Sequence, residues 1–213
     1  MMKFYKPVLV LLLSASLLTS CSKSDYSIPA TPAQAAYANE LRDDFNSDTH
    51  SWSYNNLADS SSINIAGGYL FYAAHSTIKG IIQNGLATSI SSSANFLLET
   101  RVISDNTMGL SFGANDTAKG FSFKIDGFGH YALFNEGDTT HSAWPVLNWT
   151  TSNTICLSTP NILKFEQVGN SWNGYINAIK VFSITARPLL GNKVGFMMTN
   201  GTNGQADYLD IKW

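Results

Sequence analysis

The sequence predicts an all-β domain over residues 41–213, built as a two-sheet antiparallel sandwich, and three observations predict it. Beyond Leu41 the apolar residues recur with a period of two, which is the spacing of strands that bury one face. Turn residues such as Gly169-Asn170 interrupt this pattern at short intervals. The composition is 44% hydrophobic and 12% aromatic at a formal charge of −2, so the chain can bury a core.

The first 20 residues have the features of a signal peptide. Lys3 and Lys6 form a basic region, and the apolar stretch after them is too short to span a bilayer comfortably. The stretch ends in Leu18-Thr19-Ser20-Cys21, which resembles the lipobox of bacterial lipoproteins. In that family the chain is cleaved before the cysteine, whose sulfur carries lipid. The resemblance implies that Cys21 anchors the mature protein in the cell envelope, at the outer membrane of a Gram-negative bacterium.

Residues 21–40 are predicted to form a flexible tether, because they are rich in Ser, Ala and Pro and have no apolar period. With Cys21 lipidated, Cys156 is the only remaining thiol, so no intramolecular disulfide is expected. Its neighbours Ile155 and Leu157 indicate a small buried core residue.

Alternating segments continue from the tether to the end of the chain. In residues 121–126 the Phe and Ile side chains take one face, and Ser, Lys and Asp take the other. Comparable patterns occupy 96–102, 108–113, 163–166, 172–177, 179–184, 194–198 and 208–213. About a dozen short strands must close their edges, and a sandwich, a jelly roll or a barrel does so. Turns of unequal length argue against a propeller of equal blades.

The order of several short motifs resembles concanavalin A-like lectin/glucanase domains. The motifs are Asp43-Asp44-Phe45 with Trp52, Gly68-Tyr69-Leu70, Phe96-Leu97-Leu98-Glu99-Thr100, Gly120-Phe121-Ser122-Phe123 and Val194-Gly195-Phe196. Laminin-G-like and 3-keto-disaccharide-hydrolase-like domains, which occur in many bacterial lipoproteins, are the most similar. The resemblance implies a jelly-roll sandwich with one concave sheet that often binds glycans.

A glycosidase site of the glucanase kind is not visible in the sequence. Retaining glycosidases need two carboxylates about 5 to 5.5 Å apart, and related glucanases carry a Glu-x-Asp-x-x-Glu cluster. Glu99 has no acidic residue at positions 97, 101 or 103. We therefore expect a non-catalytic, glycan-binding or glycan-associated module. The alternatives are a sugar hydrolase with an unrecognised carboxylate site and a structural subunit of an envelope assembly.

Two aromatic stretches are candidate glycan platforms, because sugar rings stack on flat aromatic faces while nearby polar groups bind the hydroxyls. One stretch offers His130, Tyr131, Glu136 and Trp144, and the other offers Trp172 and Tyr175. Trp149 is assigned to the core because it alternates with Asn148.

No cofactor is expected, with calcium as a minor candidate. The first and last strands of such sandwiches commonly lie side by side, so Asp43, Asp44, Asp207 and Asp210 could gather around a hard cation. The four His residues show no zinc spacing. Basic residues are scattered singly, which argues against a nucleic-acid partner.

Overall fold

Alternating apolar side chains build two antiparallel sheets that pack face to face. The computed structural model describes residues 37–213 except 57–60, 75–80, 116–118 and 138–141. This part of the chain forms fifteen strands and no helix. Among the described residues, therefore, no helix is long and apolar enough to cross a membrane. The predicted signal peptide, Cys21 and most of the predicted tether lie outside the described residues.

The larger sheet has nine strands in the order β13-β12-β11-β6-β15-β4-β3-β2, with β1 also paired to β15. Its strands are β1 (Glu40–Asp43), β2 (Tyr54–Asn56), β3 (Ser61–Ala66), β4 (Tyr69–Ala74), β6 (Phe96–Ser104), β11 (Asn161–Val168), β12 (Ser171–Ile176), β13 (Ile179–Thr185) and β15 (Thr202–Lys212). The first strand, β1, pairs with the last, β15, over the register from Glu40↔Lys212 to Asp43↔Leu209, as is common in sandwiches of the predicted kind.

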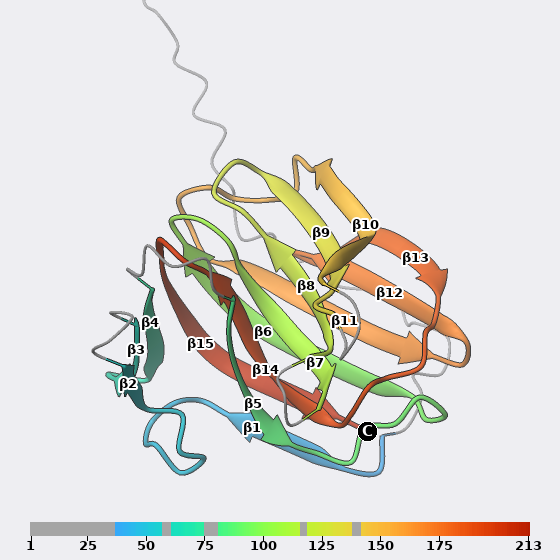
Figure 1. Ribbon diagram of the computed structural model, residues 1–213, viewed down its shortest axis with the longest axis horizontal. Coiled ribbons are helices and arrows are strands. Elements are labelled where there is room, and N and C mark those ends of the chain that lie inside the picture. The colour runs from blue at the N-terminus through green and yellow to red at the C-terminus, as the bar shows by residue number, and fades with distance from the viewer. Residues whose placement is uncertain (1–36, 57–60, 75–80, 116–118, 138–141) are drawn as a thin grey trace, which may run out of the picture. The chain divides into compact units, whose positions relative to one another are not determined.

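The smaller sheet has six strands in the order β10-β9-β8-β7-β14-β5. They are β5 (Ile81–Ala87), β7 (Met108–Ala114), β8 (Phe121–Ile125), β9 (His130–Asn135), β10 (Trp144–Thr151) and β14 (Lys193–Thr199). Figure 1 shows the two sheets as stacked layers. The predicted two-sheet antiparallel sandwich is confirmed.

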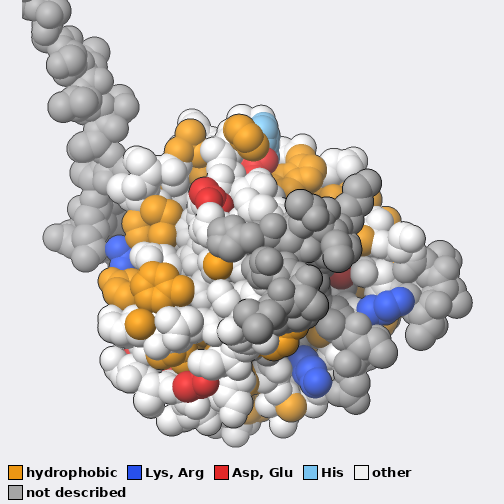
Figure 2. All heavy atoms as spheres, turned by 60° about the vertical axis from the view of Figure 1, so that its left-hand side comes forward, with side chains coloured by type: hydrophobic (Ala, Val, Ile, Leu, Met, Phe, Trp, Pro, Cys, Tyr) orange, Lys and Arg blue, Asp and Glu red, His pale blue; other side chains and the backbone are white. Residues whose placement is uncertain are grey.

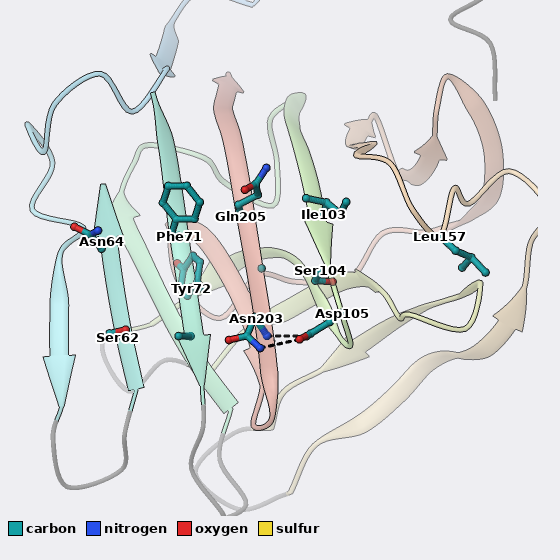
Figure 3. A pocket seen from close by; sticks show the side chains of 12 residues that line it. Ser62, Asn64, Phe71, Tyr72, Ile103, Ser104, Asp105, Leu157, Asn203 and Gln205 are labelled. Atoms are coloured by element: carbon teal, nitrogen blue, oxygen red, sulfur yellow. Dashed lines mark hydrogen bonds between the residues drawn. The ribbon is translucent and has the colours of Figure 1, made fainter. Parts of the chain in front are cut away.

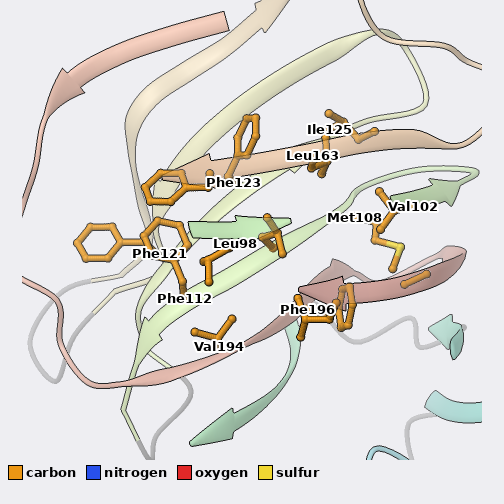
Figure 4. Packing of buried hydrophobic residues seen from close by; sticks show 14 of the residues in the cluster. Leu98, Val102, Met108, Phe112, Phe121, Phe123, Ile125, Leu163, Val194 and Phe196 are labelled. Atoms are coloured by element: carbon orange, nitrogen blue, oxygen red, sulfur yellow. The ribbon is translucent and has the colours of Figure 1, made fainter. Parts of the chain in front are cut away.

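The core lies between the sheets and is rich in aromatic rings (Figure 4). The ring of Phe112 in the six-stranded sheet lies 4.1 Å from that of Phe165 in the nine-stranded sheet. Trp172 packs edge-on against Phe121 at 4.8 Å, and its indole N–H donates to Gln167 Oε1 at 2.8 Å. Fully burying each such side chain contributes roughly 1.5–3 kcal/mol.

Asn177 and Ala178 form the two-residue turn between β12 and β13. Their φ angles are 50° and 69°, so both lie in the left-handed region that a type I′ hairpin turn requires. Asn tolerates this region, whereas Ala reaches it only against a steric penalty from its Cβ.

Cys156 differs from its sequence-based prediction in two ways. Its side chain is half-buried rather than fully buried, and it is disulfide-bonded. The sequence has one other cysteine, Cys21, which lies outside the described residues. The sequence predicts a free Cys156 thiol because the sulfur of Cys21 is expected to carry lipid. A sulfur that carries a thioether-linked lipid cannot also form a disulfide, so the two states exclude each other.

Candidate functional site

Polar side chains on the outer side of the six-stranded sheet are buried, although this side faces away from the core. Phe121, Phe123 and Ile125 of β8 point into the core, so Ser122 and Lys124 point outward. The Lys124 side chain is only 5% exposed, and that of Glu136, just after β9, is 2% exposed. Charged side chains on an outer sheet face are normally hydrated, so this burial marks a specialised site.

An ion pair forms the centre of this region. Lys124 Nζ donates to Glu136 Oε1 at 2.9 Å, and the Ser122 hydroxyl donates to the same oxygen. Glu136 Oε2 is buried and has no hydrogen-bond partner in the described part of the chain. Buried carboxylate oxygens are usually paired, so Oε2 is an unsatisfied acceptor whose partner would have to be a group or a water held inside the site.

Two aromatic rings cover the ammonium group. Lys124 Nζ lies 4.0 Å from the centroid of Phe134 and 6.0 Å from that of Trp149, and the two ring centroids are 6.2 Å apart. The cation is attracted to both ring faces and restricts their orientation. Trp149 is 41% exposed, so the predicted core position is wrong. We call Ser122, Lys124, Phe134, Glu136 and Trp149 the β8–β10 site.

An irregularity in β10 explains the outward position of Trp149. The register between β9 and β10 shifts between Pro145 and Leu147 and again between Leu147 and Thr150. These shifts break the simple alternation on which the core prediction rested. Trp149 consequently lies beside Phe134 on the outer face.

Gly109 of β7 leaves space beneath the Lys124 side chain. A Cβ added at Gly109 would lie 2.1 Å from the carbonyl oxygen of Phe123 and 2.8 Å from the Cβ of Lys124. Burial lowers the pKa of the Lys124 amine, and the nearby Glu136 carboxylate opposes that decrease. The charged ammonium form of Lys124 is therefore stabilised chiefly by the Glu136 carboxylate.

Of the four candidates in the first aromatic stretch, the structure places only Glu136 in the β8–β10 site. His130 lies at the other end of β9, with Nδ1 2.8 Å from Asp126 Oδ2. Tyr131 is buried, and its hydroxyl donates to the carbonyl oxygen of Val181 at 2.9 Å, so its expected exposure is wrong.

The two tryptophan candidates, Trp144 and Trp172, also lie away from this site. Trp144 is in register with Asn135, which directly follows Phe134 in β9. Because successive side chains of a strand point to opposite faces, Trp144 lies on the opposite face of the sheet from Phe134. Trp172 is fully buried in the core, so its expected exposure is wrong. The alternating pattern assigns each residue to one of the two faces of a strand. It does not show which of these faces packs against the core.

Tyr175 is half-buried on the outer face of the nine-stranded sheet. Its hydroxyl donates to Glu166 Oε1 at 2.6 Å, and Lys164 Nζ lies 4.1 Å from its ring centroid. Burial and the Glu166 carboxylate raise the pKa of the Tyr175 phenol above its ordinary value. Tyr175 thus belongs to a local network separate from the β8–β10 site.

The four aspartates predicted as calcium ligands bind separate partners. Asp43 is buried and accepts hydrogen bonds from the Phe45 amide and the Trp52 indole. The other three form ion pairs, Asp44 with Arg42, Asp207 with Arg101 and Asp210 with Lys212. Within the described residues, no group of three or more His, Cys, Asp or Glu side chains could hold a metal ion. The structure therefore does not bring the four together.

A pair of carboxylates does face each other across two strands of the nine-stranded sheet. Glu99 of β6 is in register with Asp210 of β15, which places their Cβ atoms about 4.5–5.5 Å apart. Tyr208 donates its hydroxyl proton to Glu99 Oε1 at 2.8 Å. Asp210 Oδ1 is buried without a partner, and burial raises the pKa of Asp210. Spacing along a single strand does not reveal this pair, because Glu99 and Asp210 lie on strands far apart in the sequence.

Charge is sparse over the visible surface. On the face shown in Figure 2, the coloured Lys, Arg, Asp and Glu side chains are scattered among hydrophobic and uncharged polar ones. No single-sign field that would attract a highly charged polymer is visible there.

Comparison with known proteins bears on the fold. No protein-family model matches the chain, and no curated protein does. Among solved structures, the CBM2 module of the evolved Dit protein of Lactobacillus casei BL23 phage J-1 is similar. Its TM-score is 0.55 at 12% identity, over 81% of this chain and 94% of that one.

Two glycoside hydrolases are also similar. The β-glucanase of Bacillus licheniformis has a TM-score of 0.50 at 11% identity, over 84% of this chain and all of that one. The xylan β-1,4-xylosidase of Bacillus halodurans C-125 has a TM-score of 0.55 at 12% identity, over 87% of this chain and 41% of that one. The fold is a jelly-roll sandwich of the concanavalin A type. At such low identity the likeness concerns the fold alone.

Proposed function

We propose that this protein is a lipid-anchored envelope protein whose sandwich binds carbohydrate at the β8–β10 site without cleaving it. The observation that carries the proposal is the partly exposed indole of Trp149 beside Phe134, above a buried Lys124–Glu136 pair with one unpartnered oxygen. A sugar ring can stack its C–H face on the indole, and polar groups held nearby orient its hydroxyls. The solved neighbours include carbohydrate-binding modules, which supports a binding role on this fold.

Among the described residues, the carboxylates of this face favour binding over hydrolysis. Glu136 follows the last residue of β9, whereas Asp126 bonds to His130 at its first residue. Six residues of strand separate them by roughly 17 Å. Paired acid and base carboxylates in glycosidases stand no more than about 9.5 Å apart.

Glycan arrays and calorimetry on matched aromatic variants test this proposal. Trp149→Ala is expected to weaken glycan binding at least tenfold, while Phe128→Ala, which removes a 76% exposed ring from the β8–β9 turn, leaves it unchanged. Trp144→Ala should also leave it unchanged, because its register places it on the other side of the ladder. Absence of glycan binding by the intact protein, or wild-type affinity in Trp149→Ala, would overturn the proposal.

A sugar hydrolase is the second candidate function, because Glu99 and Asp210 face each other. The raised pKa of Asp210 suits a general acid, and Glu99 would serve as its partner carboxylate. Release of reducing sugar from a polysaccharide panel tests this candidate. Activity that disappears in both Glu99→Gln and Asp210→Asn supports hydrolysis, and no release by the intact protein rejects it.

Lipidation of Cys21 rests on its lipobox-like context, Leu18-Thr19-Ser20-Cys21, and requires that the Cys21 sulfur is not in a disulfide with Cys156 in the mature protein. Long acyl chains contribute about 0.8 kcal/mol per buried CH₂, so several chains on one cysteine hold a soluble domain at a bilayer. Intact-mass spectrometry of the mature protein should find acylated Cys21 as its first residue, and membrane separation should recover it with the outer membrane.

Two cysteine variants separate lipidation from disulfide formation. Cys21→Ala is expected to release the protein from membranes, whereas Cys156→Ser should leave it membrane-bound. A mature protein with an unacylated Cys21 linked to Cys156 would reject the anchor.

A further inference from the structure

An open pocket of about 640 Å³ lies on the outer face of the nine-stranded sheet, on the other sheet from the β8–β10 site. This volume is within the range of about 300–1,000 Å³ typical of small-ligand clefts. Register across β3, β4, β15 and β6 places Asn64, Phe71, Gln205 and Ile103 in one row. Figure 3 shows these four side chains following one another across neighbouring strands. We call this cavity the Phe71 pocket.

The Phe71 pocket combines an exposed aromatic ring with side-chain amides. Phe71 is 38% exposed, and Tyr69 on the same strand lies 6.1 Å from it between ring centroids. Asn64 and Gln205 flank Phe71 on either side in the row, and neither makes a side-chain hydrogen bond within the described part of the chain. The pocket thus offers a flat apolar surface between free amide donors and acceptors.

The described lining carries one formal charge, that of the Asp105 carboxylate. Asp105 is its single carboxylate among the described lining residues, and both of its oxygens are occupied. Oδ1 accepts from the Asn203 backbone amide at 2.7 Å, and Oδ2 accepts from the Asn203 side-chain amide at 2.7 Å (Figure 3). No Lys or Arg is among the described lining residues. An anionic ligand would therefore lose hydration and face the Asp105 carboxylate without a cationic partner from the described lining, which disfavours it. A cationic ligand would meet only Asp105, whose two oxygens already accept hydrogen bonds.

Two further classes of occupant fit poorly. A purely apolar ligand would cover the amides of Asn64 and Gln205 and leave them unsatisfied, at about 1–3 kcal/mol for each buried group. A peptide added as a strand needs a free sheet edge. The row crosses β4 and β15, which are paired on both sides and have no free edge.

We propose that the Phe71 pocket is a second binding site, specific for a neutral saccharide. The C–H face of the sugar stacks on Phe71, and its hydroxyls exchange hydrogen bonds with Asn64 and Gln205. The site is independent of Trp149, because it lies on the other sheet. With both sites filled, one protein molecule holds two separate saccharide segments.

The test measures calorimetric stoichiometry and affinity for neutral oligosaccharides, with uronic acid oligosaccharides as charged probes. Wild-type protein is expected to bind two neutral ligands and Trp149→Ala one. The double variant Trp149→Ala/Phe71→Ala should bind none. Gln205→Ala in the Trp149→Ala background should weaken the remaining site at least tenfold. Phe128→Ala is the aromatic control, and an unchanged urea midpoint shows that each variant is folded.

The outcomes separate this inference from the proposed function. Loss of one neutral-sugar site in Phe71→Ala supports the pocket whether or not Trp149→Ala changes binding. Wild-type stoichiometry and affinity in both Phe71→Ala and Gln205→Ala would overturn the pocket while leaving the β8–β10 site intact. Tighter binding of the uronic acid probes at the Phe71 site, or no binding of neutral sugars in the Trp149→Ala background, would also overturn it.

Discussion

Removing one charge of the Lys124–Glu136 pair should destabilise the protein far more than breaking a surface ion pair. Lys124→Met keeps most of the side-chain volume but leaves the Glu136 carboxylate buried, with only the Ser122 hydroxyl as a donor. Glu136→Gln leaves the Lys124 ammonium buried against Phe134 without a counter-charge. In both cases an uncompensated charge stays in a poorly hydrated place.

The burial of both partners determines the expected magnitude. With side-chain exposures of 5% and 2%, the pair belongs to the buried class, in which loss of one partner costs about 3–5 kcal/mol. An exposed pair would cost about 0.2–1 kcal/mol. The double variant Lys124→Met/Glu136→Gln removes both charges and should lose much less than the sum of the single losses.

Urea denaturation followed by tryptophan fluorescence measures these free energies of unfolding from the midpoint and slope. The loss in Glu136→Gln should shrink as pH rises, because the folded-state pKa of Lys124 lies below its unfolded value. The folded state then binds fewer protons than the unfolded state, so its stability increases with pH through that window. Single losses below about 1 kcal/mol with additive energies in the double variant would refute the reasoning.

Three further predictions concern stability. Gly109→Ala should destabilise the domain by about 2 kcal/mol or more, measured by urea unfolding, because its Cβ would lie 2.1 Å from the Phe123 carbonyl oxygen. Ala178→Gly should stabilise it by about 0.5–1 kcal/mol in the same assay, because φ is 69° there; a destabilised variant would contradict the turn geometry. Burial raises the phenol pKa of Tyr72, and burial with the Glu99 carboxylate raises that of Tyr208. The folded state then keeps protons that the unfolded state loses above about pH 10, so stability should fall as pH rises beyond that point. Ultraviolet titration should show these phenols ionising together with unfolding, and reversible ionisation of all tyrosines in the folded protein would contradict this.

Local pattern was enough to predict the architecture. A period of two assigns alternate residues to opposite faces of a strand, and this placed Phe121 and Phe123 together against Ser122 and Lys124. Short turns between such strands favour antiparallel neighbours, and many strands without helices require an architecture that closes its edges. The order of the motifs, which resembles that of concanavalin A-like domains, favours a two-sheet sandwich among these architectures. These properties depend on residues a few positions apart and can therefore be read from the sequence.

The candidate sites depend on contacts that local pattern does not encode. Glu136 meets Lys124 because β8 and β9 pair, and Glu99 meets Asp210 because the last strand inserts beside β6. Trp149 was misassigned because irregularities in β10 reverse the local alternation.

The sequence by itself determined the all-β class, the alternation of apolar and polar residues in its strands, and the supply of aromatic and polar side chains. Tertiary structure alone decided which of them converge. It buried Trp172 and exposed Trp149. It also placed Gln205 of the last strand beside Asn64 and Phe71 of the β3–β4 hairpin. The physical reason is that alternation divides a strand into two faces by local geometry, whereas register, bulges and sheet order select neighbours through packing of the whole domain.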